Sequence, residues 1–151
     1  MLKSFLFSLL FILYCSCSNY KYKIIFSEQN PKINSFSYFY QGIFLEKSGK
    51  WNKAVESFQK AKNFDSKSAR IYKHLAKCFA NLNSKEIAVI NLKKSEKYAD
   101  KKDYLIYYDI GTIYHELGFI MEAKRCYKKS LNIFPNFKKC YVALASLNYN
   151  N

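Results

Sequence analysis

The chain has 151 residues, which is enough for one domain and a short leader, because single hydrophobic cores usually organise about 100–200 residues. Half of the residues are apolar or aromatic, and the chain contains only four glycines and two prolines. This composition excludes a disordered chain and favours a packed, mainly helical protein.

The formal net charge of +14 is typical of proteins that bind nucleic acid or anionic membranes, since basic side chains neutralise phosphate. Almost all of this charge comes from Lys, because the chain has only two arginines, Arg70 and Arg125. The planar guanidinium group of Arg is the preferred reader of phosphates and bases. Codons for the abundant Lys, Asn, Ile, Tyr and Phe are also rich in A and T, which gives the basicity a compositional origin. The sequence therefore argues against nucleic-acid binding.

The first seventeen residues have the pattern of a secretory signal. Lys3 provides a basic start, and the apolar run 5–13 is too short to cross a bilayer comfortably, which takes about 20 residues. The small residue Ser16 then precedes Cys17, and a polar stretch follows. This segment resembles the processing site of bacterial lipoproteins, in which the cysteine is acylated on sulfur and becomes the new N-terminus.

The resemblance implies a signal peptide over residues 1–17 and lipidation of Cys17 with palmitate-like acyl chains. It places the protein at a bacterial cell envelope, anchored in the membrane on the periplasmic face or at the cell surface. A retained signal anchor and an ordinary cleaved signal of a secreted protein remain the alternatives. Residues 18–34, which include Asn30 and Pro31, are predicted to form a tether between the anchor and the folded domain.

Three cysteines remain beyond the leader: Cys78, Cys126 and Cys140. An odd number argues against a disulfide framework, and all three lie in helical patterns, so we expect small buried hydrophobic side chains. A bond between Cys126 and Cys140 is the alternative. No histidines or carboxylates recur around them at metal-ligand spacing, so no metal site is expected.

An internal period close to 34 residues begins at about residue 35. Tyr38, Tyr72 and Tyr107 are each followed by a small residue four positions later and by a large apolar residue three positions after that. The small residues are Gly42, Ala76 and Gly111, and the large ones are Leu45, Phe79 and Tyr114. A second series of alanines is followed four residues later by a large side chain: Ala54 by Phe58, Ala88 by Leu92, and Ala123 by Tyr127.

These residues and spacings resemble the tetratricopeptide repeat (TPR), a helix-turn-helix unit with an aromatic, small, Ala and Pro signature, in which Pro135 takes the terminal Pro position. The resemblance implies an all-α fold, an α-solenoid of three helix-turn-helix units plus a C-terminal capping helix. The repeats cover about residues 35–67, 69–101 and 104–136, and the cap covers 137–149, within a domain of residues 35–151. Gly49, Asn83 and Gly118 are predicted to turn the chain between paired helices, because Gly and Asn tolerate the left-handed conformation that ends a helix.

No catalytic site is expected. His74 and His115 lie in separate repeats without an evident nucleophile beside them, and the chain has neither a Gly-rich phosphate loop nor a paired-carboxylate motif. The sequence therefore predicts no enzyme, no catalytic residue and no cofactor.

In proteins of this resemblance, the first helix of each unit lines a concave groove that binds a protein or peptide. Residues spaced by three or four on those helices point into it. The predicted groove residues are Phe36, Phe39, Ile43, Arg70, Lys73, Lys77, Leu105, Tyr108, Thr112 and His115. One end of the groove would be apolar and the middle cationic, which suits a peptide with hydrophobic side chains beside an acidic residue or a C-terminal carboxylate. Some family members capture that carboxylate with Lys and Asn, and of that pattern only Lys73 is present.

Other interpretations stay open. The Arg70, Lys73 and Lys77 stripe is also what a solvated helix face of a Lys-rich protein would show. The apolar end is a candidate for cover by residues 20–30, whose large apolar side chains are Tyr20, Tyr22, Ile24, Ile25 and Phe26. The alternative function is an electrostatic binder that holds an anionic polymer, lipid or nucleic acid through its Lys-rich surface. Homo-oligomers are a further option, because Val142, Ala143 and Tyr149 make the last helix less polar than a terminal cap prefers.

Overall fold

The computed structural model describes residues 31–149. In this part of the chain there are seven α-helices and no strand. The helices are α2 (Pro31–Lys47), α3 (Trp51–Phe64), α4 (Ala69–Asn81), α5 (Lys85–Tyr98), α6 (Tyr104–Glu116), α7 (Ile120–Ile133) and α8 (Lys138–Tyr149). The predicted signal peptide, Cys17 and residues 18–30 of the predicted tether lie outside the described residues.

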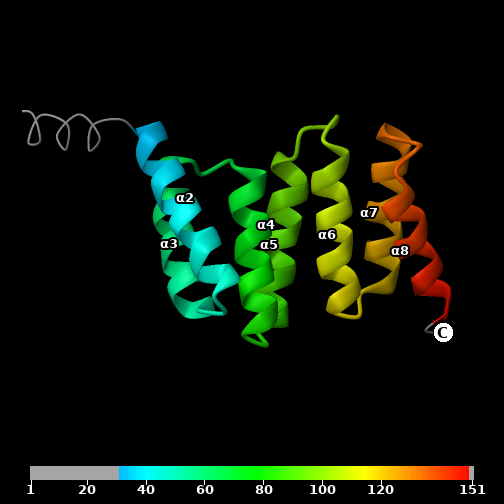
Figure 1. Cartoon of the computed structure of the whole chain (residues 1–151), viewed down its shortest axis with the longest axis horizontal. Helices are drawn as coiled ribbons and strands as arrows, with labels where there is room; N and C mark the ends of the chain where they lie inside the picture. The colour runs from blue at the N-terminus through cyan, green and yellow to red at the C-terminus, as the bar shows by residue number, and fades with distance from the viewer. Residues whose placement is uncertain (1–30, 150–151) are drawn as a thin grey trace, which may run out of the picture.

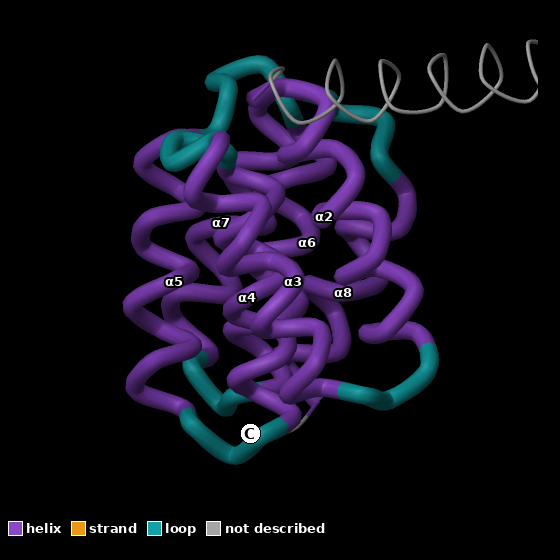
Figure 2. The backbone as a smooth tube through the Cα atoms, turned by 90° about the vertical axis from the view of Figure 1, so that its left-hand side faces the viewer, coloured by secondary structure: helices purple, strands orange, loops and turns teal. Residues whose placement is uncertain are grey.

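The helices form three antiparallel pairs, α2–α3, α4–α5 and α6–α7, which follow one another in a row and end with α8 (Figure 1). Short loops join them at the two ends of the layer (Figure 2). Each helix packs chiefly against its pair partner, and the first helices of successive pairs, α2, α4 and α6, also contact one another. The predicted all-α solenoid of three helix-turn-helix units with a capping helix is therefore confirmed.

The first helix extends into the predicted tether. α2 begins at Pro31, so residues 31–34, the last part of the predicted tether, are helical instead. Proline is favoured in the first helical turn because its φ is already near the helical value and its missing N–H needs no partner there. The prolyl residue therefore marks a helix start and not a loop.

The turns within the pairs have the predicted conformation. Gly49, Asn83 and Gly118 have φ values of 70°, 57° and 82°, in the left-handed region. The residue after each turn donates its N–H back across the end of the helix, a 6→1 bond that closes the helix terminus. These bonds run from Lys50 to the Leu45 carbonyl, from Ser84 to Phe79 and from Phe119 to Tyr114, each at 2.9 Å.

Small residues bring the two helices of each pair close together, as predicted. A Cβ atom added at Gly42 would lie 2.5 Å from the Phe58 ring, and one added at Gly111 would lie 2.8 Å from the Tyr127 ring. The second pair has Ala76 opposite Leu92, and both are fully buried. At these facing positions, the first and third pairs have Gly opposite an aromatic ring, and the second pair has Ala opposite the smaller Leu.

One serine in every pair ties the two helices together. Its Oγ donates a hydrogen bond to a backbone carbonyl of the opposite helix, between positions 26 residues apart. The bonds run from Ser35 to the Ala61 carbonyl (3.2 Å), from Ser95 to Ala69 (2.8 Å) and from Ser130 to Tyr104 (2.8 Å). The serine is on the first helix in the first pair and on the second helix in the other two. The same two positions are therefore bonded in every pair, but the helix that supplies the donor differs.

The three described cysteines, Cys78, Cys126 and Cys140, are free and fully buried. Burial raises the pKa of Cys78 and of Cys126 to about 12, and it also raises the pKa of Cys140. They are protonated packing residues, as predicted, and the alternative bond between Cys126 and Cys140 is not formed. None of the described helices is long and apolar enough to cross a membrane.

Candidate functional site: the concave surface

Three adjoining hollows lie along the first helices of the pairs. The N-terminal hollow, of about 490 Å³, lies between α2 and α4; the middle hollow, of about 380 Å³, lies between α2, α4 and α6; and the C-terminal hollow, of about 220 Å³, lies between α4 and α6. The first two share Phe39, Tyr40 and Arg70, and the last two share Lys73, His74 and Asp109. We call this continuous region the concave surface.

Nine of the ten predicted groove residues line these hollows. Phe36, Phe39, Ile43, Arg70 and Leu105 line the N-terminal or middle hollow, and Lys73, Lys77, Tyr108 and Thr112 line the C-terminal hollow, with Lys73 also reaching the middle one. The exception is His115, which is half-buried near the end of α6 and lines none of the three.

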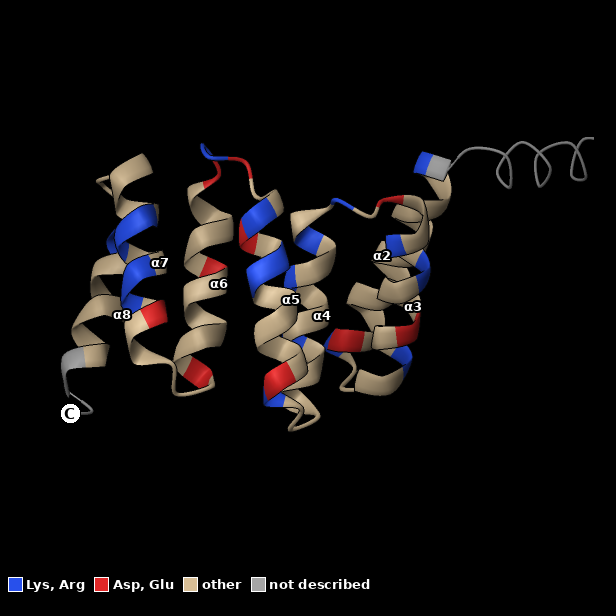
Figure 3. Ribbon diagram, turned by 180° about the vertical axis from the view of Figure 1, so that it is seen from behind, with Lys and Arg blue, Asp and Glu red and all other residues tan. Residues whose placement is uncertain are grey.

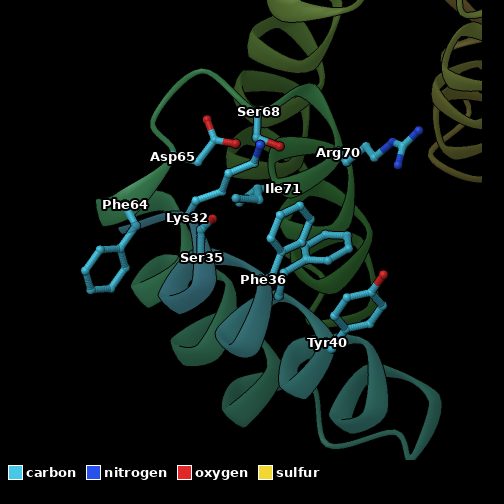
Figure 4. Close-up of a pocket in the computed structure, with 10 residues that line it drawn as sticks. Lys32, Ser35, Phe36, Tyr40, Phe64, Asp65, Ser68, Arg70 and Ile71 are labelled. Atoms are coloured by element: carbon cyan, nitrogen blue, oxygen red, sulfur yellow. The ribbon is translucent and has the colours of Figure 1, made fainter. Parts of the chain in front are cut away.

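Four of the ten residues that line the N-terminal hollow are aromatic, and the others include charged and polar side chains (Figure 4). Phe36 and Tyr40 stand along α2 and are 52% and 66% exposed, so much of both rings is free to contact another molecule. Arg70 extends from the first turn of α4 at the edge of the same hollow. Among the described residues, no carboxylate forms an ion pair with Arg70. This end of the concave surface combines exposed aromatic area with an available positive charge.

The two lysines predicted to make the middle cationic are paired with carboxylates. Lys73 Nζ donates to Asp109 Oδ2 at 2.6 Å, and Lys77 Nζ donates to Glu46 Oε1 at 2.9 Å. Each pair joins the first helices of neighbouring pairs, α4 to α6 or α2 to α4. Carboxylates of the protein itself therefore balance the positive charge of these two lysines. Arg70 is the member of the predicted stripe that is exposed and has no such ion pair among the described residues.

Sequence reasoning missed both carboxylates. Lys73 and Asp109 are 36 residues apart, and Glu46 and Lys77 are 31 apart, so each separation is close to one repeat. Since equivalent positions of successive first helices lie side by side in such an array, a search for opposite charges about one period apart would have found both pairs.

Glu46 and His74 form a shielded polar cluster next to Lys77. Glu46 is 5% exposed, and its Oε2 lies 2.6 Å from His74 Nδ1. Burial would raise the pKa of Glu46, but the hydrogen bonds and charges of His74 and Lys77 outweigh it and hold that pKa below its usual value. Burial lowers the pKa of His74, the lysine charges act in the same direction, and the hydrogen bond to Glu46 opposes them without reversing the shift. At neutral pH, neutral His74 thus donates its Nδ1–H to ionised Glu46.

The surroundings of His74 are structural. Its ring stacks on Phe58, with centroids 5.3 Å apart, and meets Phe39 edge-on at 5.4 Å. No hydroxyl or thiol of a described residue is hydrogen-bonded to it. Cys78, the thiol in the next turn of α4, stays protonated because burial raises its pKa to about 12, and a thiol is a poor nucleophile. The cluster holds helices together and offers no nucleophile.

At the C-terminal hollow, the predicted residues also take part in packing. The Tyr108 ring contacts Phe137 and Tyr127, with centroids 5.0 Å and 5.7 Å away. Thr112 Oγ1 donates to the Tyr108 carbonyl at 3.1 Å and accepts a weak bond from Tyr127 Oη at 3.4 Å. These side chains therefore pack within the protein and also form the wall of the hollow.

Basic residues are spread over the array. Seen from behind, Lys and Arg occur on several helices, with Asp and Glu between them (Figure 3). Within residues 31–149, four lysines also lie over tyrosine rings, and the shortest of these contacts places Lys129 Nζ 4.1 Å from the Tyr107 centroid. No group of three or more metal-binding side chains occurs among the residues that the structure describes.

No protein-family model matches the chain, and no curated protein matches it in sequence. Solved structures do match. The first TPR domain of Spaghetti (RPAP3), bound to the HSP90 peptide SRMEEVD, is 18% identical, with 79% of this chain and 94% of that chain covered and a TM-score of 0.68. The second TPR domain of human RPAP3, in complex with the HSP70 peptide SGPTIEEVD, is 21% identical, with coverages of 78% and 98% and a TM-score of 0.67.

The Arabidopsis OM64 TPR domain is 26% identical, with 80% of this chain and 99% of that chain covered and a TM-score of 0.67. All three likenesses extend over most of the described residues, and all three neighbours are TPR domains. The described part of this chain therefore has the fold of a tetratricopeptide repeat domain.

Proposed function

We propose that this chain is a protein-binding scaffold that holds a peptide segment of a partner on its concave surface. The observation that carries the proposal is the N-terminal hollow, where the exposed rings of Phe36 and Tyr40 lie beside Arg70. Two structural neighbours carry bound peptides, SRMEEVD and SGPTIEEVD, and both peptides end in the sequence EEVD, which contains three acidic residues. The fold similarity supports peptide binding as a class of function for this chain.

The pairing of charges narrows the partner's chemistry. Lys73 and Lys77 already neutralise Asp109 and Glu46, so a highly acidic peptide would have to compete with carboxylates of the protein itself. Among the described residues, Arg70 forms no ion pair, although Asp65 also lines the N-terminal hollow. We expect the bound segment to place one aromatic or aliphatic side chain in the N-terminal hollow and one carboxylate next to Arg70, where a bidentate contact is available.

A phage-displayed random peptide library, selected with the full chain, tests this proposal without knowledge of the natural partner. We expect enriched peptides that combine a large apolar residue with an adjacent acidic residue or free carboxylate. Their calorimetric affinity should fall by about tenfold or more in Arg70→Glu, since an anchor contact contributes about 1.4 kcal/mol or more. The matched control is Lys128→Glu, a charge reversal of an exposed lysine on α7, outside the three hollows. Equal losses in both variants would contradict a site on the concave surface.

The electrostatic alternative has its own support, which is the net charge of +14 and the spread of lysines over several helices. Binding of this kind depends on total charge and weakens steeply with salt. A complex that survives about 1 M salt, where the Debye length is only about 3 Å, would favour the groove. A complex lost at that salt and insensitive to the position of the reversed lysine would favour the electrostatic alternative.

We also propose that the scaffold is anchored by lipid at Cys17 on a bacterial envelope. The support is the apolar run 5–13 and the Ser16–Cys17 junction, both of which precede the described residues. Intact mass spectrometry of the protein from its native membrane fraction should show acyl chains on an N-terminal Cys17. A mature N-terminus elsewhere, or a Cys17→Ser variant that stays in the membrane fraction at wild-type level, would refute lipidation at this residue.

A further inference from the structure

An apolar ridge runs along the exposed side of α2. It consists of Phe36, Tyr40 and Phe44, which follow one another at helical spacing and are 52%, 66% and 68% exposed. From Phe36 to Phe44, which are eight positions apart, the helix rises about 12 Å. Large exposed aromatic side chains that share one helix face are typical of a surface that another segment covers.

The repeat relationship shows what kind of surface the ridge is. Tyr40 corresponds to His74 and Asp109, which bond to Glu46 and Lys73 of the preceding helix pair. Phe44 corresponds to Cys78 and Ile113, which are 0% and 4% exposed and belong to clusters that include residues of the preceding pair. At the positions of Tyr40 and Phe44, the second and third pairs therefore contact the chain that comes before them, whereas Arg70 and Leu105, which correspond to Phe36, are exposed.

The same comparison between repeats limits the size of the segment that could cover the ridge. Two further positions of this face hold Ile71 and Leu75 in α4, and Ile106 and Ile110 in α6, all buried. α2 has exposed Ser37 and Gln41 at these positions. A complete helix pair, or the end of a second copy of the array, would bury both polar groups, at a cost unless each finds a hydrogen-bond partner. The ridge therefore fits a narrow occupant.

We infer that residues 20–26 of the same chain fold back and cover the ridge of α2. Five of these seven residues are large and apolar: Tyr20, Tyr22, Ile24, Ile25 and Phe26. The intervening residues 27–30 are as many as a β-turn needs to reverse the chain. An extended run of seven residues spans about 23 Å, which is enough to follow the ridge of about 12 Å. The short connection also gives the segment an effective concentration in about the millimolar range, which favours it over a separate molecule.

This inference does not depend on the proposed function. Phe36 and Tyr40 also line the N-terminal hollow, so a docked segment would narrow that hollow and compete with a peptide there. Phe44 lines none of the three hollows. A substitution at Phe44 therefore reports on docking of the segment, whereas Arg70→Glu reports on peptide binding.

Hydrogen–deuterium exchange of the full chain, read by mass spectrometry, tests the inference. We expect amides of residues 20–26 to exchange at least about tenfold more slowly than in an unstructured peptide. Phe44→Ser should remove this protection, and Met121→Ser should leave it unchanged, because Met121 is a 75% exposed side chain on α7. Both changes are at exposed sites, so the fold should persist, which the exchange of α4 to α7 checks within the same experiment.

Three results would overturn the inference. The first is exchange of residues 20–26 at the unstructured rate in the wild-type chain. The second is protection that persists in Phe44→Ser. The third is protection that increases with protein concentration, which would assign the ridge to a second copy of the chain.

Discussion

Glu46 Oε2 in α2 lies 2.6 Å from His74 Nδ1 in α4, and both side chains are largely shielded from water. The folded protein holds His74 neutral, because burial lowers its pKa below 6.5, whereas His74 in the unfolded chain binds a proton near pH 6.5. The unfolded state therefore binds more protons than the folded state as the pH falls through this range. Acid should destabilise the fold well above the range in which carboxylates titrate.

The first prediction concerns this pH dependence. The free energy of unfolding should be constant near pH 7.5 and should decrease as the pH falls below about 6.5. The pKa of Glu46 is lowered in the folded protein, which adds a further loss of stability below the ordinary pKa of a glutamate, 4.5. Urea denaturation between pH 5 and 7.5 measures the slope. In His74→Gln, which keeps a donor but cannot titrate, the loss between pH 6.5 and 5.5 should become smaller; an unchanged slope would assign it to other groups.

The second prediction separates the two partners of Glu46. Glu46→Ala removes a buried acceptor and leaves two donors without it, so it should cost about 1–3 kcal/mol of unfolding free energy. Lys77 is 44% exposed, and water can replace its contact, so Lys77→Met should cost less than about 1 kcal/mol. Denaturant midpoints of the two variants decide the order. A larger effect of Lys77→Met would mean that its charge, and not the His74 contact, holds Glu46 in place.

The third prediction uses the size relationship within the helix pairs. Gly42→Ala would place a Cβ 2.5 Å from the Phe58 ring and should destabilise the fold by about 1–3 kcal/mol through overpacking. Adding Phe58→Leu should recover part of this loss, because Ala76 and Leu92 already form that combination in the second pair. Thermal denaturation of both variants and of Phe58→Leu alone gives the coupling energy. Additive effects would show that the ring does not limit the helix approach.

The fourth prediction exchanges the serine between helices. Ser35→Ala removes a buried donor to the Ala61 carbonyl and should cost about 1 kcal/mol. Ser35→Ala combined with Ala61→Ser reproduces the arrangement of the second pair, where Ser95 donates to Ala69, and should recover most of the stability. The midpoints of the single and double variants in urea test this. A double variant no more stable than Ser35→Ala would mean that the carbonyl of residue 35 is out of reach.

The period in the sequence predicts the array because each structural requirement is met by one or two residues at fixed positions of the repeat, and these positions recur. A small residue such as Gly42 is needed wherever two helices touch, and a left-handed residue such as Gly49 is needed wherever a helix ends in a tight turn. Each requirement recurs three times, so a chance match at one position carries little weight. The fold and the turns could therefore be predicted from the residues alone.

The partners on the concave surface could not be predicted in the same way. Reading one helix face shows that Lys73 and Lys77 point outward from their own helix, but not which side chains of the neighbouring helix reach them. Asp109 and Glu46 come from the third and first pairs, and only the side-by-side stacking of α2, α4 and α6 brings them near α4. The start of α2 was missed for a different reason: Pro31 among polar residues resembles a loop, whereas it occupies the first turn of a helix.

The ion pairs that cross between helix pairs give the array a mechanical property. Glu46–Lys77 and Lys73–Asp109 link neighbouring pairs along the inner side, and Arg125–Glu96 links α7 to α5 at 2.7 Å. A solenoid bends by small rotations between successive helix pairs. Ion pairs between neighbouring first helices oppose rotations that would move those helices apart and widen the concave surface. Partly exposed links of this kind are weakened by salt. The curvature of the array should therefore decrease as the ionic strength rises. The concave surface would then offer a wider space to a bound segment.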